Sequence, residues 1–118
     1  KADVGQDILA TLLDSDDGAR RLGEAALIPY NSPISQSNML FYETLFDENA
    51  SCHLALGKDY PTCLAGGTNL SDEEAAAAGL NDSMVHVDFM IGSADMTIEG
   101  LCEDGTVVPV FINGNWAN

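Results

Sequence analysis

A histidine and a carboxylate two residues apart give the strongest chemical signal in this sequence. His86 and Asp88 lie in the segment Met84–Ile91, where polar and apolar residues alternate as in a β-strand. Side chains two apart on a strand point to the same face, so these two project together. An imidazole beside a carboxylate on a rigid strand provides two ligands of the kind that divalent metals prefer. The segment therefore predicts half of a metal site.

The second histidine, His53, ends a polar segment that also contains Glu48. We expect this segment at a junction between a helix and a strand, where functional side chains are common. Histidine is the commonest metal-ligating side chain, but an isolated histidine is more often a half-buried structural residue. From the residues alone, both interpretations of His53 stay open.

Glu24 and Tyr60 also allow a functional and a structural interpretation. Glu24 stands in the otherwise apolar segment Leu22–Ile28, where an ionised carboxylate is costly to bury unless it is paired or binds metal. It equally fits an exposed position on an edge strand or a cap. Tyr60 has a phenol that can donate a hydrogen bond to a developing oxyanion. Packing in the turn before Pro61 is the simpler account of this tyrosine.

The charge balance excludes several classes of partner. Four Lys and Arg oppose 19 Asp and Glu, for a formal net charge of -15. Such a surface repels phosphate backbones and anionic lipids, so we expect neither nucleic-acid nor membrane binding. It favours divalent cations or the free amine of a peptide, although solubility alone can explain most of an acidic surface. Three cysteines without a CxxC spacing indicate reduced thiols in a cytosolic protein.

The pattern of residues predicts an α+β fold in a single domain spanning 1–118, with early helices and short strands and then an antiparallel sheet. A hairpin is expected at Asp104-Gly105, near the C-terminus. Helices are predicted at Val4–Leu13, at Met39–Phe46 behind a cap at Ser35 or Ser37, and after a capping box at Ser71. Strands are predicted at 23–28, 52–56, 85–91, 96–101 and 106–112.

Several blocks of the sequence resemble the C-terminal region of the thermophilic metallo-aminopeptidases, the family of aminopeptidases T and S. They are GEAALIPY at 23–30, LFYETLFDENASCHLALG at 40–57, NDSMVHVDFMIG at 81–92 and NGNW at 113–116. The resemblance covers nearly the whole chain from about Leu22 onward.

The resemblance implies a cytoplasmic, homodimeric exopeptidase that removes the N-terminal residue of peptides with a water activated by two divalent metal ions, which are Zn, Co or Mn. The metal ligands that it implies are Glu24, which also has a catalytic role, Glu48, His53, His86 and Asp88. Tyr60 matches a tyrosine with a catalytic role.

Family members are longer, with an N-terminal α/β domain and a further glutamate ligand upstream. We therefore expect a C-terminal fragment that carries most of the metal site but not all of it. Two other interpretations stay open, a non-catalytic acidic module that binds one cation and a plain dimerisation domain.

Overall fold

The computed structural model describes residues 2–117, which form two compact units. Unit 1 combines the chain up to Ala25 with Leu54–Phe89, and unit 2 combines Ala26–His53 with the chain from Met90 on. Each unit is thus built from segments far apart in the sequence. The single domain expected from the sequence stays a prediction.

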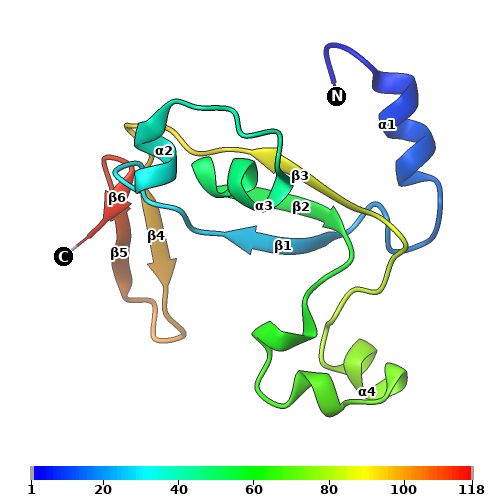
Figure 1. Ribbon diagram of the computed structural model, residues 1–118. Coiled ribbons are helices and arrows are strands. Elements are labelled where there is room, and N and C mark those ends of the chain that lie inside the picture. The colour runs from blue at the N-terminus through cyan, green and yellow to red at the C-terminus, as the bar shows by residue number, and fades with distance from the viewer. Residues whose placement is uncertain (1, 118) are drawn as a thin grey trace. The chain divides into compact units, whose positions relative to one another are not determined.

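Short helices and two strands come first along the described chain and four strands come last, in agreement with the α+β prediction (Figure 1). The helices are α1 (Gln6–Leu13), α2 (Pro33–Ser37), α3 (Thr44–Asp47) and α4 (Asp72–Ala77), with 3-10 turns at Glu48–Ala50, Pro61–Cys63 and Gly67–Asn69. The strands are β1 (Leu22–Ala26), β2 (His53–Gly57), β3 (His86–Met90), β4 (Ile98–Leu101), β5 (Val107–Ile112) and β6 (Asn115–Trp116). The five predicted strands and the capping box at Ser71 are confirmed.

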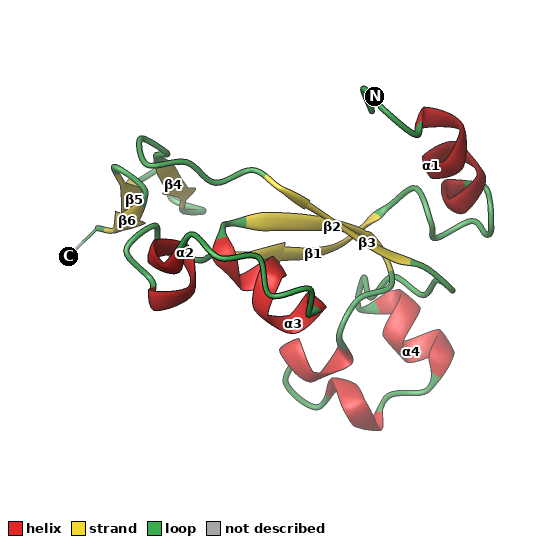
Figure 2. Cartoon of the chain, turned by 45° about the horizontal axis from the view of Figure 1, so that its top comes forward, coloured by secondary structure: helices red, strands yellow, loops and turns green. Residues whose placement is uncertain are grey.

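The strands form two three-stranded sheets, in the orders β1-β2-β3 and β4-β5-β6 (Figure 2). In the second sheet β4 pairs antiparallel with β5 through the predicted hairpin. β3 belongs to the first sheet, although the sequence places it directly before the late strands. In that sheet Lys58 N donates to Val85 O at 2.7 Å, and this antiparallel register puts Ala55 opposite Asp88.

The predicted helix Met39–Phe46 is wrong. The chain is helical before it, in α2, and again from Thr44, but it is irregular between them. Tyr42 adopts a left-handed conformation with φ 57°. The Asp47 carboxylate accepts hydrogen bonds from Phe41 N at 2.8 Å and Glu43 N at 3.1 Å, which takes these amides out of a helical ladder. The observed caps are Ser32 for α2 and Glu43 for α3.

Gly57 allows the close approach of β2 and β3 at the point where the pair ends. Its φ is 101°, and a Cβ there would collide with the Val85 carbonyl oxygen. Only glycine meets both requirements without strain. Since His86 follows Val85, this contact also fixes where the histidine begins its strand.

Asp16 anchors the loop before β3 to the loop before β1. One carboxylate oxygen accepts from Gly18 N and Ala19 N, each at 2.9 Å. The other accepts from Met84 N at 2.8 Å and from the Ser83 hydroxyl at 3.1 Å. The Met84 bond is the largest cause that holds the pKa of Asp16 below its usual value of 3.8. Two loops of unit 1 are thereby joined by one side chain.

Gly57→Ala should destabilise the protein more than an alanine at another left-handed glycine. Gly105 has φ 83° with open space within 4 Å of the position that an added Cβ would take, so Gly105→Ala should cost about 1–2 kcal/mol for backbone strain alone. Gly57→Ala adds the collision with Val85 and should cost about 3 kcal/mol or more. Urea unfolding of both variants measures the difference. Equal losses would show that the approach of β2 and β3 is not tight.

Asp16→Asn should lose stability in a pH-dependent way. Because the pKa of Asp16 is lowered in the folded protein, its ionised form contributes stability that is present above the usual value of 3.8 and lost as pH falls through the folded-state pKa. The difference in unfolding free energy between wild type and Asp16→Asn should be full above about pH 5 and shrink in more acidic buffer. Asp17→Asn is the matched control, and the same pH dependence in both variants would contradict this role.

Candidate metal centre

Glu24, His86 and Asp88 converge in unit 1 on one small volume. Glu24 comes from β1 and the other two from β3, so the side chains of the two outer strands meet across β2. His86 Nε2 lies 3.2 Å from Glu24 Oε2 and 3.2 Å from Asp88 Oδ1. One ligand atom from each residue lies within 4.8 Å of the others. The fully buried Ala55 opposite Asp88 keeps the central strand small at this point.

The backbone sets the orientation of the His86 imidazole. Its Nδ1 lies 2.6 Å from the carbonyl oxygen of Lys58. A carbonyl only accepts, so Nδ1 carries the proton of this bond. In the neutral ring Nε2 then has the lone pair, and it faces the two carboxylates. Metal-ligating histidines are oriented by a hydrogen bond of this kind.

His86 Nε2 and the carboxylate oxygens near it are arranged to bind a cation better than to share a proton in a hydrogen bond. Among the described residues, His86 Nε2 and Asp88 Oδ1 are buried and form no hydrogen bond, although each lies close to the other. A proton on Nε2 would have no well-aligned acceptor here. The side chains of Glu24, His86 and Asp88 are 24%, 22% and 15% exposed, so water screens them only in part. One imidazole and two carboxylates suit Zn²⁺, Co²⁺ or Mn²⁺.

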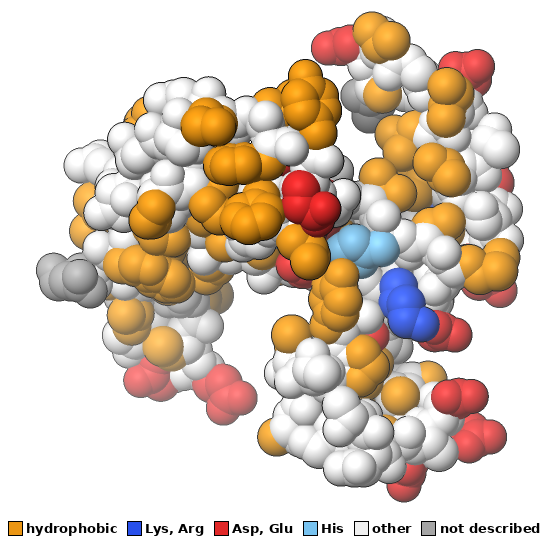
Figure 3. Space-filling model, in the orientation of Figure 1, with side chains coloured by type: hydrophobic (Ala, Val, Ile, Leu, Met, Phe, Trp, Pro, Cys, Tyr) orange, Lys and Arg blue, Asp and Glu red, His pale blue; other side chains and the backbone are white. Residues whose placement is uncertain are grey.

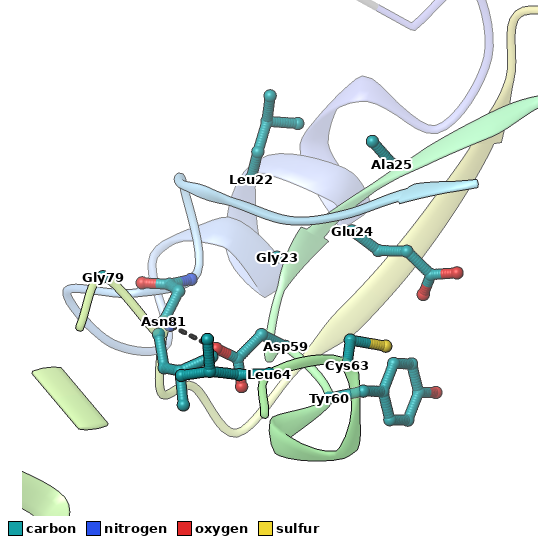
Figure 4. A pocket seen from close by; sticks show the side chains of 11 residues that line it. Leu22, Gly23, Glu24, Ala25, Asp59, Tyr60, Cys63, Leu64, Gly79 and Asn81 are labelled. Carbon is teal, nitrogen blue, oxygen red and sulfur yellow. Dashed lines mark hydrogen bonds between the residues drawn. The ribbon is translucent and has the colours of Figure 1, made fainter. Parts of the chain in front are cut away.

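Tyr60 lies directly beside this cluster. Its ring packs edge-on against the His86 ring, with centroids 5.2 Å apart and an interplanar angle of 61°. Tyr60 and Glu24 also line a pocket of about 390 Å³ in unit 1, together with the backbone around Gly23 and the segments at Asp59 and Asn81. Figure 4 shows the Glu24 carboxylate and the Tyr60 phenol on the same side of this pocket. A substrate group held at the cluster would therefore be within reach of the phenol.

Glu48 and His53 belong to unit 2. His53 opens β2 and is 2% exposed, and its Nδ1–H donates to the Ser51 carbonyl at 3.0 Å. As in His86, a backbone carbonyl accepts a hydrogen bond from Nδ1–H, so Nε2 is the nitrogen that can accept one. Glu48 begins the 3-10 turn Glu48–Ala50 and is half-buried. Both stay predicted ligands.

Sequence reasoning missed the groups that orient the histidine strand. The Lys58 carbonyl, Ser83 and Asp16 carry no metal-ligand signal, and their connection depends on the pairing of β2 with β3. The one usable signal was the aspartate at the start of the Asp16-Asp17-Gly18 turn, since such a residue often caps nearby amides.

Large apolar side chains are exposed on both units, and Figure 3 shows them over much of one face. Among the most exposed are Val4, Tyr42, Met84 and Leu101, at 92%, 89%, 81% and 78%. Exposed apolar surface on this scale is common at sites where proteins bind other proteins. No described helix has the length and apolar character that a membrane span requires.

The chain is similar to known proteins along almost its whole length. The family model described as thermophilic metalloprotease (M29) matches residues 1–116. Aminopeptidase 2 of Geobacillus stearothermophilus is 62% identical over 116 residues, and aminopeptidase AmpS of Bacillus subtilis (strain 168) is 59% identical over 117. These alignments cover 98% and 99% of this chain and 28% of each relative, so the chain spans little more than a quarter of their length.

A solved structure gives the same result for the fold. Wild-type AmpT from Thermus thermophilus matches with a TM-score of 0.88 and 47% identity, over 100% of this chain and 28% of that one. With a family model over nearly all residues and a close structural match, the resemblance noted in the sequence is confirmed: this chain belongs to the thermophilic metalloprotease (M29) family.

Proposed function

We propose that this chain carries part of the catalytic centre of a metal-dependent aminopeptidase, an exopeptidase that hydrolyses the N-terminal peptide bond of its substrates. The observation that carries the proposal is the convergence of Glu24, His86 and Asp88 on one cation-sized volume, with the Nε2 lone pair turned inward. Relatives named as aminopeptidases support the reaction class.

We propose two divalent ions, Zn, Co or Mn, with Glu48 and His53 completing the ligands that this chain supplies. Bound there, a divalent ion supplies a water that is nucleophilic at neutral pH and a Lewis acid for the scissile carbonyl. The chain's own residues then do three things. His86 and Asp88 hold fixed positions on β3, Glu24 provides a carboxylate that can take a proton from water, and Tyr60 provides a donor beside them.

The proposed reaction breaks the carbon–nitrogen bond of the first peptide unit. Water adds to the carbonyl carbon, its proton passes to a carboxylate of the cluster, and that proton leaves on the departing amine. The phenol of Tyr60 donates to the oxygen on which negative charge develops. The acidic surface, at a formal charge of -15, favours the free amine that every substrate of an aminopeptidase presents.

The assembly and location that we propose follow from the family. We propose a homodimer in the cytoplasm, to which the exposed apolar side chains of both units would contribute part of the buried surface. Sedimentation of the protein at its full natural length tests the dimer directly, and a monomer at micromolar concentration would refute it.

Wild type and Asp88→Asn should change their order of stability when metal is added. Without metal the variant should be as stable as wild type or more so, because two carboxylates no longer oppose each other. With Zn²⁺ at about 100 times its dissociation constant, wild type should gain about 2.7 kcal/mol and the variant much less. Release of N-terminal residues from peptides should fall in parallel.

Thermal melts with and without Zn²⁺, on the protein at its full natural length, provide the measurement. Asp95→Asn is the control, since Asp95 is exposed in unit 2 and its carboxylate accepts a hydrogen bond from the nearby Ser93 hydroxyl. If Zn²⁺ stabilises all three proteins equally, the cluster is not the binding site. If metal binds and no peptide is cleaved, the non-catalytic module is the correct interpretation.

Tyr60→Phe should lower kcat by about 10²–10³-fold with metal content and Tm unchanged, because it removes one donor to the oxyanion and keeps the ring that packs on His86. Steady-state hydrolysis of aminoacyl p-nitroanilides measures it. Tyr42→Phe, at a tyrosine that is 89% exposed in unit 2, is the control. A kcat within twofold of wild type would remove Tyr60 from the mechanism.

A further inference from the structure

The Lys58 carbonyl that binds His86 lacks the strand bond that a regular antiparallel pair would give it. Lys58 N donates to Val85 O at 2.7 Å, and in a regular antiparallel pair Val85 N would return a bond to Lys58 O. Here Val85 N donates instead to the Ser83 hydroxyl oxygen at 3.2 Å. The Lys58 carbonyl is thereby left to His86 Nδ1, at 2.6 Å.

Ser83 is held in place to accept that bond. It is 7% exposed, and its hydroxyl donates to Asp16 Oδ2 at 3.1 Å while it accepts from Val85. The next residue, Met84, donates its N–H to the same carboxylate oxygen at 2.8 Å. The hydroxyl therefore donates its proton to Asp16 and uses one of its two lone pairs for Val85.

The segment before Ser83 is fixed independently. The Asn81 amide donates to Gly18 O at 2.9 Å and to Gly57 O at 2.6 Å, and Asn81 N donates to Asp59 Oδ2 at 2.7 Å. A Cβ at Gly18 would collide with the Asp82 carbonyl oxygen, so the two loops pack as closely as backbone allows. These contacts hold the segment so that the Ser83 hydroxyl stays within reach of the Val85 amide.

We propose that Asp16 and Ser83 are positioning residues that select the His86 tautomer which presents Nε2 to a metal. Asp16 accepts a hydrogen bond from the Ser83 hydroxyl, and that hydroxyl accepts one from Val85 N. The Lys58 carbonyl then accepts its hydrogen bond from His86 Nδ1–H. The proposal rests on the proposed function only in that the cluster binds metal. Outer hydrogen bonds of this type typically change metal affinity by about 10–100-fold.

The test is Ser83→Ala in the protein at its full natural length. Without the hydroxyl, Val85 N turns to the Lys58 carbonyl and competes with His86. In metal-free protein, ¹⁵N NMR of the imidazole should show wild-type His86 with the proton on Nδ1 and the variant as a mixture of the two tautomers. Zn²⁺ affinity should fall at least about tenfold in the variant. Ser83→Thr keeps the hydroxyl and should restore both values.

Ser93→Ala is the matched control, because Ser93 also donates to an aspartate, Asp95, but lies in unit 2. If Ser83→Ala does not fold, Asp16→Asn replaces it, with the same two measurements. A wild-type tautomer signature and wild-type Zn²⁺ affinity in a folded variant would overturn the inference. Wild type that binds no Zn²⁺ would instead overturn the proposed function, so the two failures are distinguishable.

Discussion

The hydrogen bond from His86 Nδ1 to the Lys58 carbonyl is the interaction on which the candidate site depends. It decides which ring nitrogen carries the proton and turns the other, Nε2, toward Glu24 and Asp88. The same bond satisfies a carbonyl at the end of β2 that the strand ladder leaves open. One contact therefore satisfies the carbonyl at the end of β2 and orients the histidine of the candidate metal site. A change that removes it affects both.

Electrostatics makes this arrangement costly without a cation. Two carboxylates and a nitrogen lone pair face one another while water covers only a minor part of each side chain. The chain already has a formal charge of -15, and its few Lys and Arg, four in all, can offset little of it. A divalent cation bound there would replace this repulsion with attraction, and its binding would then be coupled to the stability of the sheet.

The sequence predicted those parts of the site that depend on local periodicity. His86 and Asp88 share a face because a strand has a period of two, and this needs no tertiary information. Glu24 lies 62 positions before His86, so only the family resemblance could join them. The helix prediction at Met39–Phe46 failed because the Asp47 side chain binds Phe41 N and Glu43 N, a polar contact that apolar spacing does not report. The role of Ser83 was missed since a serine before a strand is common and its partner, Asp16, is distant.

The described chain holds its site with backbone and polar contacts more than with an apolar core. Only Leu13, Ala19, Cys52, Ala55 and Phe111 are buried apolar residues among those described, while side chains as large as Met84 and Tyr42 are exposed. A core this small supplies little of the free energy that fixes a metal site. The glycine contacts at Gly57 and Gly18 and the hydrogen bonds of Asp16 and Asn81 instead determine where β3 begins. Because these contacts are short and directional, they fix the position of His86 even though the surrounding apolar side chains are exposed.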